Sequence, residues 1–216
     1  MKKWIVTLLL CSGLQCSLSA ASSEPTAPKL ALERLIEGNK RFYKDKSEHP
    51  NRTEERRLET AGGQHPYAII LGCSDSRVAP EIIFDEGIGD LFIVRVAGNV
   101  LGPIGMESIH YSAIYLNSAI IVVLGHESCG AVQAVLNNNT KDIETIATQI
   151  KEAADRTKGQ GDLRLENTIK LNAKMMVQQL KNDPVLSDLI KKKKLDIVGG
   201  YYDFHTGKVE ILTPGL

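Results

Sequence analysis

Two short segments of this chain bring together residue types that bind metals and carry charge. The first reads Cys73-Ser74-Asp75-Ser76-Arg77 and the second reads His126-Glu127-Ser128-Cys129-Gly130. Two thiolates and one imidazole make three protein ligands for zinc, and three ligands leave the fourth tetrahedral position open for water. The pattern therefore predicts a catalytic site with one Zn²⁺ per chain, held by Cys73, His126 and Cys129.

Asp75 and Arg77 follow the first cysteine closely, and two interpretations fit them. They could form a simple salt bridge or loop cap, which is a common arrangement. Alternatively, the guanidinium holds the carboxylate by a charge-assisted hydrogen bond and aims it at water on the metal. Because a predicted metal ligand lies two residues from Asp75, we favour the second interpretation.

Two other roles for a pair of cysteines fit this sequence less well. A structural disulfide is common in exported proteins, but it has no need of Asp75, Arg77 or His126 at these spacings. A thiol-redox protein typically carries Cys-x-x-Cys, and the sequence contains no such motif. We therefore favour a metal site over either alternative.

The elements that must position these residues follow from the apolar pattern. Nearly continuous apolar runs predict strands that are covered on both faces, and they alternate with segments of helical periodicity. This alternation predicts an α/β fold with helices on both faces of a mostly parallel sheet of four strands. Both metal segments directly follow a strand, so they are expected at the carboxyl edge of the sheet, where open α/β folds place active sites. The expected strands are 67–71, 91–96, 119–124 and 195–198, the expected helices are 106–116, 129–136 and 140–180, and residues 208–212 are expected to add an antiparallel edge strand.

The amino-terminal part of the domain predicts helices. Apolar residues recur at helical spacing in a first helix, and a second is expected to begin near the cap Thr53 and to end at Gly62-Gly63. An isolated chain would expose the apolar stripe of the first helix, so we expect a helical arm that reaches a partner. The stripe consists of Leu32, Leu35, Ile36 and Phe42.

The first residues have the pattern of a secretory signal peptide. Lys2 and Lys3 precede a short apolar stretch, and small residues near Ala21 fit the cleavage rule. We expect residues 1–21 to be removed and 22–216 to form a single domain that is exported, in a bacterium to the periplasm. Lipidation at Cys11 or Cys16 is a weaker alternative, because the residues before them suit it poorly.

The charge balance gives no indication of a nucleic-acid or membrane partner. The full chain has 26 basic and 26 acidic residues, and loss of two lysines with the signal peptide leaves 24 against 26, a net charge of −2. A nearly neutral protein of this kind does not present the basic surface that nucleic acids or anionic membranes attract.

The two metal segments together resemble those of the β-class carbonic anhydrases. In that family the zinc ligands are two cysteines and a histidine, which fall here on Cys73, His126 and Cys129, and the Asp/Arg dyad falls on Asp75 and Arg77. The resemblance implies reversible hydration of carbon dioxide to bicarbonate and a proton, by hydroxide on the zinc that the dyad orients.

The resemblance also implies substrate contacts. Gln64, nine residues before Cys73, would donate a hydrogen bond to bound bicarbonate or carbon dioxide, and Phe92 would line an apolar pocket. Ala97 stands where many members carry valine, and Gly130 is placed among the substrate contacts. Without the resemblance, Phe92 fits a core residue and Gln64 a loop residue.

Some members of the family have a closed form in which the aspartate binds zinc, so Asp75 is also a possible metal ligand. The members that close under bicarbonate control carry tryptophan three residues before the first cysteine, where this chain has Ile70, although Arg95 matches the arginine of that site. We therefore predict an open, active site at neutral pH.

The resemblance implies a homodimer or tetramer that acts on carbon dioxide and bicarbonate. Two rival functions remain on the same fold: hydrolysis of carbon disulfide or carbonyl sulfide, and a catalytically silent zinc-binding assembly protein. The intact pair of Asp75 and Arg77 argues against the silent protein.

Overall fold

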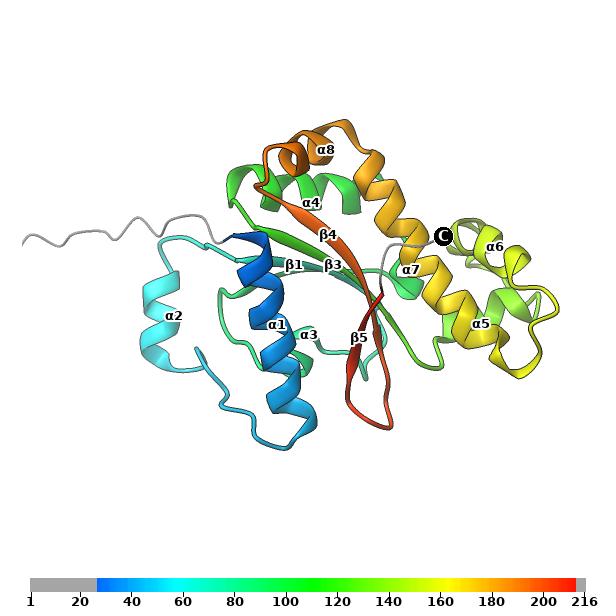
Figure 1. Cartoon of the computed structure of the whole chain (residues 1–216), viewed down its shortest axis with the longest axis horizontal. Coiled ribbons are helices and arrows are strands. Elements are labelled where there is room, and N and C mark those ends of the chain that lie inside the picture. The colour runs from blue at the N-terminus through cyan, green and yellow to red at the C-terminus, as the bar shows by residue number, and fades with distance from the viewer. Residues whose placement is uncertain (1–26, 213–216) are drawn as a thin grey trace, which may run out of the picture.

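A five-stranded sheet lies at the centre of this computed structural model, which describes residues 27–212 (Figure 1). The strands are β1 (Ala68–Gly72), β2 (Leu91–Arg95), β3 (Ile120–His126), β4 (Asp196–Tyr202) and β5 (Val209–Leu212). They lie side by side in the order β2-β1-β3-β4-β5, and β5 runs antiparallel to β4 whereas the other neighbours are parallel. The expected sheet of four parallel strands with an antiparallel edge strand is confirmed.

Helices cover both faces of the sheet, as expected. They are α1 (Pro28–Tyr43), α2 (Glu54–Thr60), α3 (Pro80–Ile83), α4 (Pro103–Tyr115), α5 (Gly130–Leu136), α6 (Glu144–Arg156), α7 (Arg164–Asn182) and α8 (Pro184–Lys191), with 3₁₀ turns at Ala97–Asn99 and Gly161–Leu163. Alternate residues of a strand point to opposite faces. Accordingly, Ile69 and Leu71 of β1 join a core beneath α4 to α8, while Ala68 and Ile70 join a second core beneath α1 and α3.

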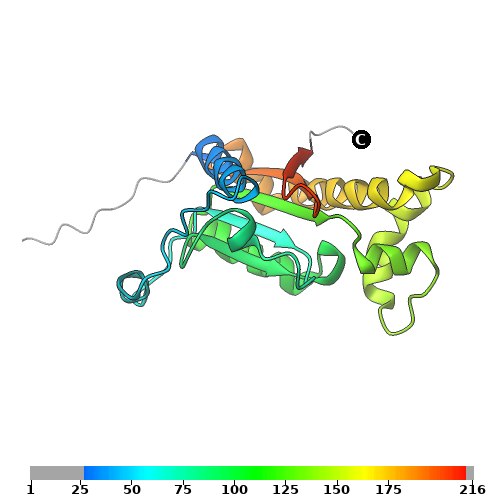
Figure 2. The ribbon, with the colours of Figure 1, turned by 90° about the horizontal axis from the view of Figure 1, so that it is seen from below.

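The carboxyl ends of the parallel strands meet at one edge of the sheet. In Figure 2 the arrowheads of these strands point to the side on which α5 and α6 project. Because β1 pairs in parallel with both β2 and β3, its last residue Gly72 lies beside Arg95 and Leu124. The chain segments that follow β1 and β3 are therefore brought to one place.

The long helical pattern expected over residues 140–180 divides into α6 and α7. The break contains Gly159 and Gly161, which adopt φ values of +82° and +57°. This left-handed conformation is unfavourable for other residues, so two glycines two positions apart end one helix and allow the next to begin.

The first helix packs on the sheet of its own chain. Leu35 is 1% exposed and belongs to the second core, and Leu32 and Phe42 pack against this core. The helix is also held by charge, because Nε of Arg41 donates to the buried carboxylate of Asp85 at 2.6 Å. The expectation of a largely exposed apolar stripe is therefore wrong for these three apolar residues.

The expected signal peptide, residues 1–21, and its cysteines Cys11 and Cys16 lie outside the described residues. Within residues 27–212, no helix combines the length and the apolar character that are needed to cross a membrane.

Candidate metal centre and active site

The three predicted metal ligands converge at the carboxyl edge of the sheet. Cys73 follows the last residue of β1, His126 is the last residue of β3, and Cys129 caps the start of α5. Their ligand atoms, two Sγ and a ring nitrogen, all lie within 4.8 Å of one another. Since β1 and β3 are neighbouring parallel strands, the fold itself assembles this triangle.

His126 presents a nitrogen that suits a metal. Its side chain is fully buried, and Nδ1 lies 2.8 Å from the carbonyl oxygen of Glu127. A carbonyl can only accept, so Nδ1 carries the proton and Nε2 has a free lone pair. Nε2 is buried and has no hydrogen-bond partner among the described residues. A metal at this point would remove the cost of that unpartnered atom.

The two thiols are free, buried and unequal in acidity. Cys73 and Cys129 form no disulfide in residues 27–212. The hydrogen bond from Cys129 lowers the pKa of Cys73 to about 4 against the effect of burial, and the backbone N–H of Gly98 acts in the same direction. The same hydrogen bond, together with burial, raises the pKa of Cys129. The metal-free pair thus holds one thiolate, and a dication that binds both sulfurs would release the remaining proton.

Asp75 and Arg77 form a closely fitted pair beside the three ligands. The guanidinium of Arg77 donates from Nε to Oδ1 at 2.9 Å and from Nη2 to Oδ2 at 2.8 Å, and its backbone N–H also donates to Oδ1 at 2.9 Å. The hydrogen bonds from Arg77 lower the pKa of Asp75 to about 2. Oδ2 of this ionised carboxylate lies 3.9 Å from Nε2 of His126.

Hydrogen bonds from Arg95 and Gly98 hold the segment after β1 in place. Arg95 at the end of β2 donates from Nε to the carbonyl of Cys73 at 3.0 Å and from Nη2 to the carbonyl of Asp75 at 2.6 Å. The backbone N–H of Gly98 donates to Sγ of Cys73 at 3.3 Å. Gly98 has φ +72°, and a Cβ there would come within 2.8 Å of Cδ1 of Ile150. This position therefore favours glycine.

Comparison with known proteins identifies the family. Residues 68–209 match the family model described as carbonic anhydrase. This chain belongs to the carbonic anhydrase family. A relative named carbonic anhydrase 2, from Mycobacterium tuberculosis, is 51% identical over 111 residues, and the alignment spans 51% of this chain and 54% of the relative, about half of its length.

Solved structures place this family member in the β class. The β-carbonic anhydrase CafA of Aspergillus fumigatus matches with a TM-score of 0.71 and 26% identity, over 87% of this chain and 91% of that chain. A structure of tetrameric β-carbonic anhydrases from Sordaria macrospora matches with a TM-score of 0.69 and 23% identity, over 85% of this chain and 97% of that chain. The resemblance stated from the two metal segments is confirmed.

Two residues that the family resemblance assigned to substrate lie away from the metal ligands of their own chain. Gln64 is exposed and lies before the first residue of β1, whereas Cys73 follows the last residue of β1. The two residues are therefore separated by the length of a five-residue strand, roughly 16 Å at 3.3 Å per residue. Phe92 pairs with Ile69 near the start of β1, and its ring lies 6.3 Å from that of Tyr111 on α4.

The other two expected substrate contacts, Ala97 and Gly130, lie beside the metal ligands. Ala97 begins the 3₁₀ turn whose second residue, Gly98, bonds to Cys73. Gly130 follows Cys129, is exposed, and has open space where a Cβ would project. Of the four expected substrate contacts, the structure thus brings Ala97 and Gly130 close to the metal ligands.

The expectations from sequence did not include Phe204 or Glu127. Phe204, in the turn between β4 and β5, places its ring centroid 5.4 Å from that of His126 and 4.3 Å from Cζ of Arg77. Glu127 accepts from the backbone N–H of Phe204 at 2.8 Å. The position of Glu127 between two predicted metal ligands could have suggested a role for it. The position of Phe204 could not be predicted in this way, because it depends on strand pairing between segments that are far apart in the sequence.

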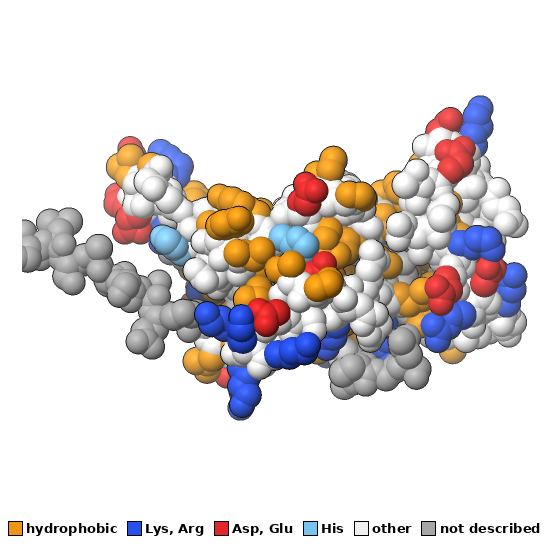
Figure 3. Space-filling model, turned by 90° about the horizontal axis from the view of Figure 1, so that it is seen from above, with side chains coloured by type: hydrophobic (Ala, Val, Ile, Leu, Met, Phe, Trp, Pro, Cys, Tyr) orange, Lys and Arg blue, Asp and Glu red, His pale blue; other side chains and the backbone are white. Residues whose placement is uncertain are grey.

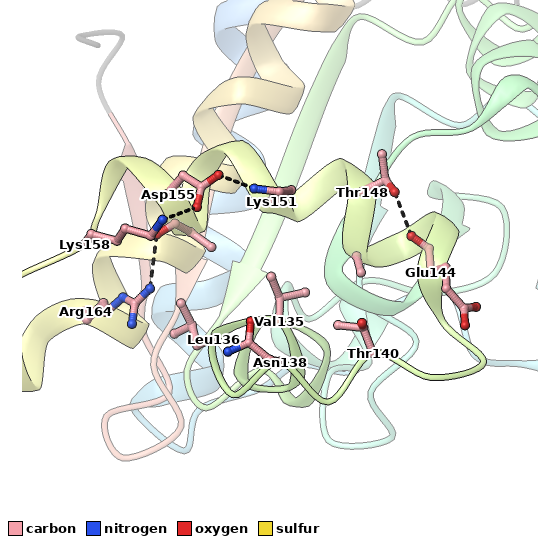
Figure 4. A pocket seen from close by; sticks show the side chains of 12 residues that line it. Val135, Leu136, Asn138, Thr140, Glu144, Thr148, Lys151, Asp155, Lys158 and Arg164 are labelled. Atoms are coloured by element: carbon pink, nitrogen blue, oxygen red, sulfur yellow. Dashed lines mark hydrogen bonds and ion pairs between the residues drawn. The ribbon is translucent and has the colours of Figure 1, made fainter.

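A surface hollow of about 600 Å³ lies apart from these ligands, between α5, α6 and the start of α7 (Figure 4). Its cationic side chains are largely neutralised by Asp155, which contacts Lys151 at 2.5 Å and Lys158 at 2.9 Å. None of the metal ligands lines it.

Proposed function

We propose that this protein catalyses the reversible hydration of carbon dioxide to bicarbonate and a proton, at a zinc ion held by Cys73, His126 and Cys129. One observation carries the proposal. A ring nitrogen of His126 lies within 4.8 Å of the two free thiols, and its unpartnered Nε2 lies 3.9 Å from the carboxylate of Asp75. Family membership supports carbonic anhydrase chemistry for this arrangement.

The donor set fits zinc. Two sulfurs and one neutral imidazole nitrogen are ligands that zinc prefers, and three protein ligands leave one position for water. Zinc bound there would supply Lewis-acid activation of a water molecule near neutral pH. The hydrogen bond from Nδ1 of His126 to the carbonyl of Glu127 fixes the ring and leaves Nε2 as the nitrogen that could bind a metal.

Asp75 lies beside the three ligands, where its carboxylate would accept a hydrogen bond from a water molecule held there. Its low pKa keeps it ionised, so it acts as an acceptor at neutral pH. Arg77 binds both carboxylate oxygens and thereby fixes the direction in which the remaining lone pairs point. The pair would orient the attacking water toward carbon dioxide.

We extend the proposal to an open site at neutral pH. Both oxygens of Asp75 accept from Arg77, which opposes their use as a fourth metal ligand. Arg95 is bound to the carbonyl oxygens of Cys73 and Asp75. A spectrum or crystal structure of the zinc protein that shows four protein ligands would overturn this part of the proposal.

The active form proposed is a homodimer or tetramer. Gln64 lies before β1 and Phe92 lies beside the start of β1, whereas the metal ligands follow the ends of the strands, so a substrate role for these two residues would require the site of a second copy. An apolar surface is available for association: Figure 3 shows hydrophobic side chains gathered over α4 and α8. Exposed apolar residues of α4 include Ile104, Tyr111, Ile114 and Tyr115. The likeness to a chain described as tetrameric supports this proposal.

The proposed place of action is outside the inner membrane, after removal of residues 1–21. The supporting observation is the basic and apolar pattern of the first residues. Cell fractionation and amino-terminal sequencing of the mature protein test it, and a full-length cytoplasmic protein would contradict it.

Stopped-flow hydration of carbon dioxide tests the proposed reaction. We expect zinc-dependent turnover in the purified protein and a loss of about 100-fold or more in Asp75→Asn, the scale of positioned acid–base groups. Asp155→Asn is a matched control, because Asp155 is also paired with cations but lies on α6 away from the metal ligands. Zinc binding without turnover would favour the silent protein, and faster turnover of carbon disulfide or carbonyl sulfide would favour the rival hydrolase.

A further inference from the structure

The turn between β4 and β5 lies against the metal ligand His126 and is closed by internal hydrogen bonds. It spans residues 203–208, and the backbone N–H of Asp203 donates to the carbonyl of Lys208 at 3.0 Å. Oδ1 of Asp203 also accepts from the backbone N–H and the hydroxyl of Thr206 at 2.7 and 2.8 Å. A turn closed by these bonds can hold a side chain in a fixed position.

Phe204 of this turn lies between a metal ligand and the guanidinium of the dyad. Its ring centroid is 5.4 Å from that of His126, and Cζ of Arg77 lies 4.3 Å from the centroid. On a third side, Tyr202 meets the same ring edge-on at 88° and 5.4 Å. The ring of Phe204 therefore has defined contacts with both parts of the site.

Glu127 fastens this turn to the segment that carries two ligands. Its carboxylate accepts from the backbone N–H of Phe204 at 2.8 Å and contacts Nδ1 of His205 at 2.9 Å. Its backbone N–H donates to the carbonyl of Tyr202 at 2.8 Å, and its own carbonyl accepts from His126. Bonds on both its backbone and its side chain thus connect the ligand segment to β4 and the turn.

We propose that Phe204 is a positioning residue that holds Arg77, and through it Asp75, and that Glu127 holds Phe204. The proposal rests on the proposed function. The Arg77 side chain is 53% exposed, so its bonds to Asp75 compete with water unless another contact restrains the guanidinium. An aromatic face supplies that restraint by cation–π attraction without competing for the hydrogen bonds.

Enzyme kinetics give the first part of the test. We expect Phe204→Leu to lower kcat/KM for carbon dioxide about 3- to 10-fold, the scale of one cation–π contact. Phe204→Tyr keeps the aromatic face and should restore nearly full activity. Phe42→Leu is the matched control, because Phe42 contacts Tyr202 at a centroid distance of 6.5 Å and belongs to the same aromatic row. It should leave kcat/KM unchanged.

The decisive part uses the zinc-free full-length protein and needs no activity. Nitrogen-15 NMR follows the Nε–H signal of Arg77, which is assigned by its loss in Arg77→Gln. Phe204→Leu and Glu127→Ala should remove the ring-current shift of this signal and speed its exchange with water, whereas Phe204→Tyr and Phe42→Leu should preserve both.

The two measurements separate the possible failures. An unchanged Arg77 signal in Phe204→Leu, or an equal change in Phe42→Leu, would overturn the positioning role. An inactive wild-type protein with the expected pattern of Arg77 signals would contradict the proposed function but support the contact itself. Misfolding of Phe204→Leu would appear as a global change of the spectrum, and Glu127→Ala would then provide the test.

Discussion

Replacement of Gly98 by alanine tests how tightly the metal ligands are supported by the fold. Its φ of +72° lies in the left-handed region, which costs other residues about 1–2 kcal/mol. The added Cβ would also lie 2.8 Å from Cδ1 of Ile150 and 3.3 Å from Cβ of Ala131, and overpacking of this kind costs about 1–3 kcal/mol. Together these terms predict a loss of about 2–5 kcal/mol in the free energy of unfolding.

The assay is unfolding of the zinc-free protein, so that metal binding does not contribute to stability. For a domain of this size, each kcal/mol lowers Tm by about 2–4 °C, so Gly98→Ala should lower it by roughly 4–20 °C. Gly63→Ala is the control for the unfolded-state effect of removing a glycine, because its φ is not positive and its Cβ would meet nothing within 4 Å.

A second substitution separates the clash from the backbone strain. Ile150→Val removes Cδ1 and should destabilise the wild type by about 0.5–1.5 kcal/mol. In Gly98→Ala it should instead recover about 1 kcal/mol or more, because the closest contact disappears. Equal stability of Gly98→Ala and Gly63→Ala, or additive effects of Gly98→Ala and Ile150→Val, would refute the reasoning.

The remaining predictions concern charge and the thiols. Arg77→Gln should lower kcat/KM by a factor that is the same at pH 7 and pH 9, because Asp75 stays ionised at both; a loss that disappears at high pH would instead indicate protonation of Asp75. Brief alkylation of zinc-free protein at pH 7, read by mass spectrometry, should label Cys73 before Cys129, and zinc should protect both; the reverse order would contradict the assigned thiolate. Asp85→Asn should lower the free energy of unfolding by about 1.5–3 kcal/mol at pH 7, measured by urea unfolding, because it weakens charge-assisted hydrogen bonds. Burial opposes ionisation of the Asp85 carboxyl, but its arginine and backbone donors outweigh burial and lower its pKa. The difference in stability between wild type and Asp85→Asn should therefore persist above about pH 4 and shrink below it. A difference that stays constant with pH would count against this account.

The strands and the ligand triangle could be predicted because their signals are local. The apolar runs at 67–71 and 119–124 became β1 and β3 with shifts of one or two residues. Parallel pairing then fixes which strand ends meet, so Cys73 and His126 had to approach each other. The expected strand at 195–198 extends to Tyr202, since Gly199 and Gly200 interrupt the apolar run without ending the strand.

Other features depended on packing that a sequence pattern does not contain. The four residues of α3 are too few to show a helical period. The apolar stripe of α1 suited either a partner or its own sheet, and the fit of Leu35 into the second core selected the sheet. Phe204 reaches the site only because β4 pairs with β3 and places the following turn beside His126.

X-ray absorption at the zinc edge tests the central claim that Cys73, His126 and Cys129 hold the catalytic metal. The account predicts one zinc per chain with two sulfur ligands at about 2.3 Å, and nitrogen and oxygen ligands at about 2.0–2.1 Å. Cys129→Ser should lose one sulfur from this shell or lose the zinc. A wild-type shell without sulfur, or one that is unchanged in Cys129→Ser, would contradict the account.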